Sequence, residues 1–296
     1  MTLAALFAAV SIVFPPEGAE LPYLKRCYVM GAADDGEEVV RLRGCEVAVG
    51  RSGAWATVID VKPGTNIVEI GGTRRMFIVE SPGTKHQALS TKHYPKLEYA
   101  SDFAKPHPTG KKPEEITVVI DAGHGGHDTG AMSPHGLPEK DANLRLARAV
   151  RDELKKRGYK VVMTREDDTF IELYDRPKVA HKANADLFVS IHHNAPGYTS
   201  NPFAIRSQSV YAWNALGERL AKAINGRMAA ADPTLVNDGV LHANFAVTRN
   251  PEIPSCLIEA DFITHPDGEC AAWDFSRRPA IAAAIADGIA DWVAGE

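Results

Sequence analysis

Three apolar segments in the second half of the chain each end in side chains that bind metals or transfer protons, and this pattern limits the fold more than any other feature. Residues 116–120 run into a glycine-rich loop, residues 187–191 run into His192, and residues 255–258 run into Glu259. Short β-branched runs that stop at glycine or polar residues are typical of buried strands. Because ligand sites in open α/β sheets gather at the carboxyl ends of strands, we expect these polar side chains to lie close together.

The segments between these strands have the periodicity of helices. Residues 141–157, for example, place Leu144, Ala147, Val150 and Leu154 on one face, and Gly158 follows as a stop signal. Alternating helices and near-continuous apolar strands predict an α/β fold, with a mostly parallel sheet covered by helices on both faces. The expected helices cover residues 141–157, 173–184, 216–228 and 281–289, and further strands are expected over 159–164 and 207–211.

His124 lies in the first of the strand-end loops, within Asp-Ala-Gly-His-Gly-Gly at residues 121–126. Alone, it fits a capped glycine turn or an anion-binding loop as well as a metal site, although the Gly-Lys-Ser/Thr ending of a nucleotide phosphate loop is missing. His192 adds a second imidazole, and Glu139, at the start of a predicted helix, adds a carboxylate. Two imidazoles and one carboxylate form a three-ligand zinc site with an open fourth position, beside which a further carboxylate can act as a base.

Four segments, in this order, resemble the motifs of the zinc-dependent N-acetylmuramoyl-L-alanine amidases, of the type that includes the bacterial cell-division amidases. The resemblance covers roughly residues 115–296. The four segments are Asp-Ala-Gly-His-Gly-Gly at 121–126, Glu-Lys-Asp at 139–141, Ser-Ile-His-His-Asn at 190–194, and the late apolar strand that ends in Glu259.

The resemblance assigns roles to individual residues. It implies that His124, Glu139 and His192 are zinc ligands and that Glu259 is the catalytic carboxylate. It also implies that the bond cleaved joins N-acetylmuramic acid to L-alanine in peptidoglycan. The substrate-binding candidates are Asn194, which also fits a role in fixing its turn, and His242, Asn244 and Arg249, which match a region beside the family's cleft.

Some of these residues have more than one interpretation. Arg249 either pairs with a carboxylate of the stem peptide or forms a structural salt bridge. His193 is adjacent to His192, and because neighbours on a strand point to opposite faces, both cannot easily reach one metal. His127, Asp128 and His135 contact substrate, support the ligands, or are surface polar groups.

The first half of the chain has the pattern of a small all-β module. Five short strands are predicted, separated by glycine and proline turns, and residues 44–70 are similar to the Ig-like modules that accompany bacterial surface enzymes. Spacing, docking, wall binding and simple stabilisation of the neighbouring domain all fit such a module. The predicted strands lie at 26–30, 45–49, 54–58, 66–70 and 75–79.

We therefore expect a small β-sandwich at 14–80, a linker at 81–113 and a catalytic domain at 114–296. Residues 1–13 are apolar but too short to span a bilayer, so they are either the remnant of an export signal or the first strand of the module. The linker is rich in proline and lysine, and its histidines His86, His93 and His107 are expected to be solvated.

Charge and cysteine content restrict the environment and the partners. A net charge of −5 provides no basic field for nucleic acid. In an exported protein, the four cysteines would allow two disulfides, of which Cys27 with Cys45 is one candidate pair, whereas Cys256 fits a reduced core residue.

The leading hypothesis is an exported zinc amidase of the periplasm or cell envelope, active on peptidoglycan as a monomer and not an integral membrane protein. Only residues 195–206 separate the strand of His192 from the next one, so we expect no inserted helix that plugs the site and needs an activator. A zinc peptidase acting on stem peptides, or a wall-binding protein without activity, are the alternatives.

Overall fold

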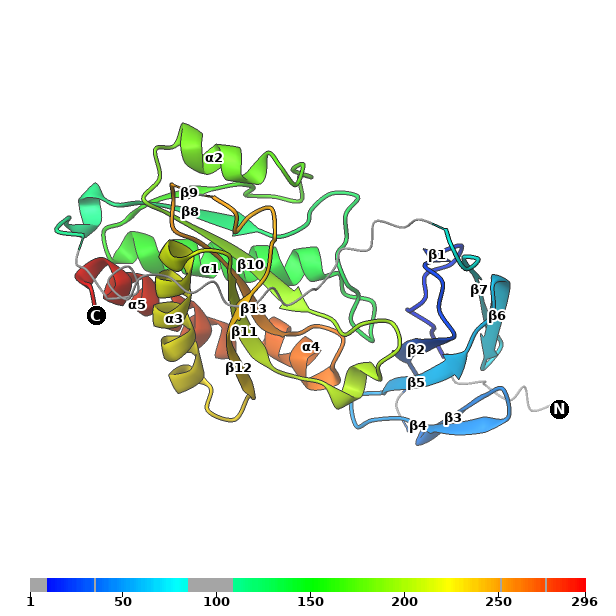
Figure 1. Cartoon of the computed structure of the whole chain (residues 1–296). Helices are drawn as coiled ribbons and strands as arrows, with labels where there is room; N and C mark the ends of the chain where they lie inside the picture. The colour runs from blue at the N-terminus through cyan, green and yellow to red at the C-terminus, as the bar shows by residue number, and fades with distance from the viewer. Residues whose placement is uncertain (1–9, 35, 85–108, 251, 275) are drawn as a thin grey trace.

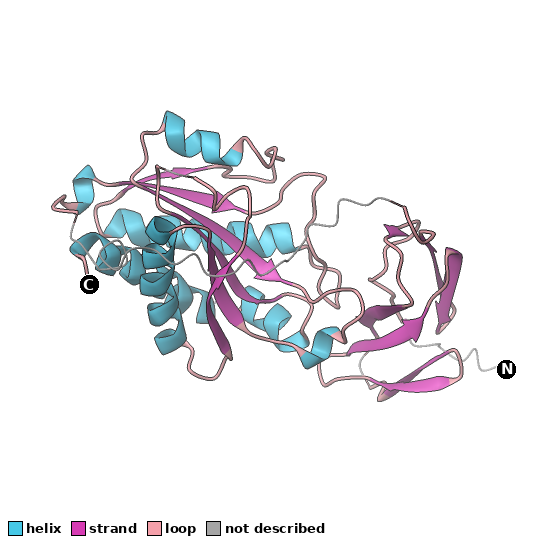
Figure 2. Cartoon of the chain, in the orientation of Figure 1, coloured by secondary structure: helices cyan, strands magenta, loops and turns pink. Residues whose placement is uncertain are grey.

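The computed structural model describes residues 10–34, 36–84, 109–250, 252–274 and 276–296. They form two parts, an N-terminal module (residues 10–80) made of strands and a C-terminal domain (residues 109–296) in which helices pack on a sheet (Figure 1, Figure 2). The expected linker falls mostly at 85–108, outside the described residues, as do residues 1–9 of the apolar N-terminal segment.

A six-stranded sheet forms the centre of the C-terminal domain. Its order is β12-β11-β13-β10-β8-β9. Strands β9, β8, β10 and β13 run parallel, whereas β11 and β12 run in the opposite direction, so the sheet is mixed. The strands are β8 (Thr117–Ala122), β9 (Lys160–Met163), β10 (Leu187–Asn194), β11 (Gln208–Ala212), β12 (Asn237–His242) and β13 (Ser255–Phe262).

Helices cover both faces of this sheet, as the alternating pattern predicted. On one face, α1, α3 and α5 pack on alternate strand residues such as Ile120, Ile191 and Ile258. On the other face, α2 and the loop before β13 pack on residues such as Phe188 and Leu257. The helices are α1 (Glu139–Lys156), α2 (Arg176–Lys182), α3 (Ala215–Ala231), α4 (Pro266–Trp273) and α5 (Arg277–Ala294), with short 3-10 turns η1 (Pro113–Glu115) and η2 (Pro202–Ala204).

The N-terminal module consists of three small sheets around a common core. The sheets pair β1-β7-β6, β2-β5 and β3-β4, and the core contains the fully buried Trp55 and Phe77. Phe14 bridges to Met30 of strand β2 and Val10 bridges to Ala33 just after it, so this part of the apolar segment pairs as a strand would. The strands are β1 (Glu20–Leu21), β2 (Arg26–Ala32), β3 (Val39–Leu42), β4 (Cys45–Ala48), β5 (Ala54–Asp60), β6 (Gly64–Ile70) and β7 (Thr73–Val79).

The two parts contact each other directly. The backbone N–H of Tyr28 on β2 donates to the carbonyl of Tyr198, 2.8 Å away, in the loop after β10. Phe14 of the module stacks on Tyr198 with ring centroids 5.8 Å apart. His135 of the C-terminal domain places Nε2 2.8 Å from the carbonyl oxygen of Ser52 in the module. The site loops and the module therefore share polar and aromatic contacts.

All four cysteines are free, so the candidate Cys27–Cys45 disulfide is not formed in this structure. Cys27 and Cys256 are fully buried, which agrees with the interpretation of Cys256 as a core residue. Within the described part of the chain, no helix has both the length and the apolar character that crossing a bilayer requires.

Candidate metal centre

The loop after β8 holds His124 in a backbone conformation that few side chains adopt. The φ angle of His124 is 60°, in the left-handed region, and Gly125 and Gly126 follow at 131° and 57°. A non-glycine residue in this region costs free energy and is found mainly where surrounding contacts enforce it, often at functional sites.

Two buried arginines supply those contacts. Arg176 of α2 donates to the carbonyls of Ala122 and His124 and pairs with the fully buried Asp121 at 2.9 Å. Arg165 donates to the carbonyl of Gly123 and also to that of Lys140, at the start of α1. The guanidinium groups thus fix the His124 loop to the helix that begins with Glu139.

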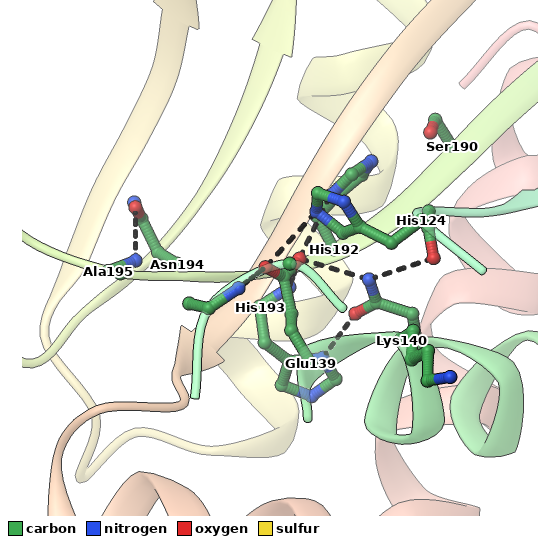
Figure 3. Close-up of polar contacts among 12 residues, drawn as sticks. His124, Glu139, Lys140, Ser190, His192, His193, Asn194 and Ala195 are labelled. Carbon is green, nitrogen blue, oxygen red and sulfur yellow. Dashed lines mark hydrogen bonds and ion pairs between the residues drawn. The ribbon is translucent and has the colours of Figure 1, made fainter. Parts of the chain in front are cut away.

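Three side chains from separate elements meet at this point (Figure 3). The loop after β8 supplies His124, whose Nε2 lies 3.2 Å from Oε2 of Glu139, the first residue of α1. Strand β10 supplies His192, whose Nδ1 lies 3.0 Å from Oε1 of the same carboxylate. One nitrogen from each imidazole and one carboxylate oxygen all lie within 4.8 Å of one another. The structure therefore brings together the three residues expected to bind metal.

His192 and His193 point to opposite sides of the sheet, as alternation requires. His193 is buried on the α1 side, with Nδ1 2.8 Å from Oδ1 of Asn143. Asn143 in turn donates from Nδ2 to Oε1 of Glu139 at 3.0 Å. Burial lowers the pKa of His193 to about 4, so this imidazole is neutral. His193 therefore supports Glu139 through Asn143 and is not part of the cluster itself.

Two glycines allow the ligands to approach one another. A Cβ at Gly123 would lie 2.2 Å from Cε1 of His192. A Cβ at Gly130 would lie 2.6 Å from both Glu139 Oε2 and His124 Cδ2, and the φ of Gly130 is 64°. No side chain fits at either position without displacing a ligand.

The electrostatics of the cluster favour a positive charge at its centre. Burial disfavours the charged form of His124, but the charge of Glu139 and the hydrogen bonds that Asp128 and Glu139 accept from the ring outweigh it and raise the pKa of His124 to about 10. Burial alone would raise the pKa of Glu139, yet the two histidines hold it well below its usual range. Asp128 lies 2.8 Å from Nδ1 of His124, which leaves Nε2 facing the cluster.

Glu259 lies next to the cluster on β13. In the parallel β10–β13 pair it is the register partner of His192. Its Oε2 is buried and has no hydrogen-bond partner among the described residues. Burial, followed by the charge of Glu139, raises the pKa of Glu259 well above its usual range. A buried carboxylate oxygen without a partner is costly, and in a cleft it is a candidate for proton transfer.

The cluster opens into a cleft of about 530 Å³. Asn194, Asn244 and Arg249 line it, so three of the four substrate-binding candidates face the same space. His242 does not line the cleft, and its Nε2 lies 3.3 Å from Glu218 of α3. On β12, which the sequence did not predict as a strand, His242 is the register partner of Ala212, which packs toward the helices, so alternation directs His242 away from the cleft.

Several residues that shape this site were not identified from the sequence. Arg165 and Arg176 lie in polar segments where an arginine is ordinarily a surface residue, and only their burial reveals their role. Asn143 lies four positions after Glu139 on α1, a spacing that could have suggested the contact. His135 contacts Glu269 and Ser52, away from the cluster.

This donor set fits zinc. Two imidazole nitrogens and a carboxylate are the ligands of many catalytic zinc sites. Here Asp128 orients His124, and Asn143 orients Glu139. Gly123 and Gly130 keep the space around the donors clear, and the unpaired oxygen of Glu259 borders it. Such a set can hold a divalent ion beside a carboxylate that moves protons.

Comparison with known proteins agrees with this geometry. Residues 118–291 match the family model described as N-acetylmuramoyl-L-alanine amidase. The N-acetylmuramoyl-L-alanine amidase AmiA of Escherichia coli (strain K12) is 35% identical over 239 residues, which cover 65% of this chain and 81% of AmiA. The probable cell wall amidase LytH of Staphylococcus saprophyticus is 27% identical over 258 residues, 86% of this chain and 84% of LytH.

Solved structures give the same result. The amidase AmiC2 of Nostoc punctiforme is 33% identical, with a TM-score of 0.58, and the match covers 62% of this chain and 99% of AmiC2. The catalytic domain of CwlV from Bacillus (Paenibacillus) polymyxa is 34% identical, with a TM-score of 0.57, over 61% of this chain and 99% of that domain. The α/β fold, the cluster and these matches together lead to one conclusion: the chain belongs to the N-acetylmuramoyl-L-alanine amidase family.

Proposed function

We propose that this protein hydrolyses the amide bond between N-acetylmuramic acid and L-alanine in peptidoglycan, with a zinc ion held by His124, Glu139 and His192. The observation that carries the proposal is the three-donor cluster beside the unpaired carboxylate oxygen of Glu259, in a chain of the amidase family. When bound, zinc supplies Lewis acidity, which polarises the amide carbonyl and makes water a better nucleophile near neutral pH.

Glu259 is the proton carrier in this proposal. An amide nitrogen leaves only when it is protonated, so a group beside the carbonyl must take a proton from the attacking water and deliver it to the nitrogen. Oε2 of Glu259 is buried, has no partner among the described residues and borders the cluster. Its raised pKa supports a role in which the carboxyl group holds a proton between the two steps.

The test is the replacement Glu259→Gln, which keeps the size of the side chain and removes its ability to carry a proton. Digestion of purified peptidoglycan, followed by mass spectrometry, should show a loss of about 10²–10⁴-fold in released peptide with a free L-alanine amine. Zinc content should remain unchanged. The matched control is Glu252→Gln, an exposed residue seven positions earlier in the chain, which should retain wild-type activity.

Undiminished hydrolysis by Glu259→Gln would refute the assigned role. The same assay separates the amidase from a zinc peptidase that acts within stem peptides, because a peptidase leaves L-alanine attached to muramic acid. Removal of zinc with a chelator should abolish activity, and added zinc should restore it.

The surroundings of the site suggest where and how the enzyme works. Residues 195–207, all of them described, contain only the 3-10 turn η2, so the site is proposed to be open without an activator protein. We further propose that the enzyme acts as a monomer in the cell envelope or periplasm. The N-terminal module is proposed to be an Ig-like spacer or wall-docking module. The LytH match covers more of this chain than the catalytic domain alone, which supports a joint role for module and domain.

A further inference from the structure

The cleft at the metal centre has two walls of different chemistry. One wall, the acidic wall (residues 170–174), belongs to the segment between β9 and α2. The other, the basic wall (residues 244–249), belongs to the loop between β12 and β13. Figure 1 shows the strands and helix that these segments join. The walls differ in charge and in exposed apolar surface, and this difference restricts how a substrate can lie.

The acidic wall presents a carboxylate and large apolar side chains to solvent. Leu173 is 44% exposed and Tyr174 is 66% exposed, although both line the cleft. Glu172 lines the same cleft and is exposed, and among the described residues no cation pairs with its side chain. Large exposed side chains beside a polar site commonly mark a binding surface, and an aromatic ring can stack on the apolar face of a sugar.

The basic wall presents a cation. Arg249 is exposed, lines the cleft, and has no hydrogen bond or ion pair with any residue that the structure describes. Within the described ranges, the structural salt bridge considered for it is therefore not formed. The other arginine of the cleft, Arg176, is buried and bound to Asp121. Arg249 is thus the cleft's accessible guanidinium, and guanidinium groups bind carboxylates through two parallel hydrogen bonds.

The strand order places the cluster between the two walls. The ligands come from β8 and β10, the acidic wall follows β9 on one side, and Tyr211 of β11 lies on the other side. Phe245 of the basic wall packs against Tyr211 with ring centroids 5.2 Å apart. A substrate whose scissile amide lies at the cluster must therefore extend toward both walls.

The two ends of a muramoyl peptide differ in the same way as the walls. The stem peptide carries free carboxylates, whereas the glycan is neutral, because the lactyl carboxyl group of muramic acid is itself part of the amide. Carboxylates are attracted by Arg249 and repelled by Glu172, over the short range that salt permits. Resting on the proposed amidase function, we propose that the substrate binds in one polarity, with the stem-peptide carboxylates on Arg249 and the glycan over Leu173 and Tyr174.

The first test measures binding in the zinc-loaded, full-length Glu259→Gln protein, where chemistry does not consume the ligand. The probes are muramoyl-L-alanyl-D-glutamate and the same compound with both carboxyl groups converted to carboxamides. Arg249→Gln should lower the affinity for the carboxylate ligand by about 10- to 100-fold. It should change the affinity for the carboxamide ligand by less than about threefold. Arg249→Lys should retain part of the affinity, and Glu172→Gln should strengthen the carboxylate ligand severalfold.

The second test addresses the glycan end. Tyr174→Ala should lower the affinity for a disaccharide form of the ligand by about tenfold. The loss should be similar for the carboxylate and the carboxamide forms, and Tyr174→Phe should bind with the affinity of the parent protein. Equal weakening of both ligands by Arg249→Gln would overturn the proposal. So would the opposite pattern, in which Tyr174→Ala responds to the carboxylates and Arg249→Gln responds to the glycan.

These outcomes are separate from the fate of the proposed function. Binding with the expected polarity by a protein whose wild-type form releases no free L-alanine amine would refute the amidase proposal and leave the polarity standing. Release of the peptide by the wild type, together with equal loss of both ligands in Arg249→Gln, would refute the polarity alone.

Discussion

At the scale of single residues, the site depends on glycines at positions where any side chain would clash with a candidate ligand. Gly123 faces the ring of His192, and a Cβ there would lie 2.2 Å from Cε1 of that ring. We predict that Gly123→Ala displaces His192, weakens zinc binding and lowers kcat/KM by about 100-fold or more, because misplacement by about 1 Å is enough for losses of this size. Zinc titration and the peptidoglycan assay measure the two effects.

The matched control for this change is Gly197→Ala, in the loop after β10. A Cβ at Gly197 meets nothing within 4 Å, so activity and zinc affinity should stay at the wild-type level. Thermal unfolding of both variants shows whether a loss is local. Wild-type zinc affinity in Gly123→Ala would contradict the close-approach argument.

The grouping of the three candidate ligands could be predicted from the sequence because each follows a strand or begins a helix. Apolar runs located the ends of β8 and β10, and Glu139 precedes a clear amphipathic pattern. Residues that act through burial or from irregular loops could not be found in this way. Arg165 and Arg176 appear as surface arginines until the fold covers them. Tyr174 was expected inside a helix over 173–184, but α2 begins only at Arg176, so Tyr174 lies in the loop before it.

At the scale of elements, the long periodic helices and the apolar strands were predicted, with bounds a few residues away from those observed. The elements that were missed have weak patterns. Helix α4 contains Pro266 and Gly268 and has little amphipathic character, and β12 is an edge strand without a buried run. Strand β3 has only four residues. Such segments are ordered by tertiary contacts, which periodicity does not encode.

Strands β2 and β13 each bury a cysteine, which gives a prediction for thiol reactivity. Burial raises the pKa of Cys27 to about 12 and raises that of Cys256 as well, so neither forms a thiolate near neutral pH. A disulfide-exchange reagent should titrate only the exposed Cys45 and Cys270 in the native protein and all four thiols after unfolding. Cys45→Ser should lower the number of reactive thiols by one in both the native and the unfolded protein. Fewer than four reactive thiols in the unfolded, unreduced wild type would reveal a disulfide.

At the scale of the whole molecule, His135 connects the N-terminal module to the C-terminal domain. Its Nδ1 lies 2.6 Å from Oε2 of Glu269 on α4, and its Nε2 lies 2.8 Å from the carbonyl of Ser52. We predict that His135→Ala loosens the module, because the hydrogen bonds to a charged partner and to the module are lost together. Hydrogen exchange of β2, whose Tyr28 N–H donates across the interface, should become about tenfold faster or more.

The control for this change is His181→Ala, an exposed histidine on α2 far from the module in the sequence. It should leave exchange in β2 unchanged. Unaltered exchange in His135→Ala would mean that the aromatic contact of Phe14 with Tyr28 and Tyr198 holds the parts together without the histidine.

The pairing of His192 with Glu259 across the parallel strands β10 and β13 can form only late in folding. The two side chains are brought face to face by neighbouring strands whose connection includes β11, α3 and β12, so nothing local in the chain can align them. A fragment that lacks β13 retains the three candidate metal ligands but has no counterpart of Glu259, the proposed proton carrier, opposite them. Any activity that needs both side chains therefore requires the complete sheet and is absent from a partly folded chain.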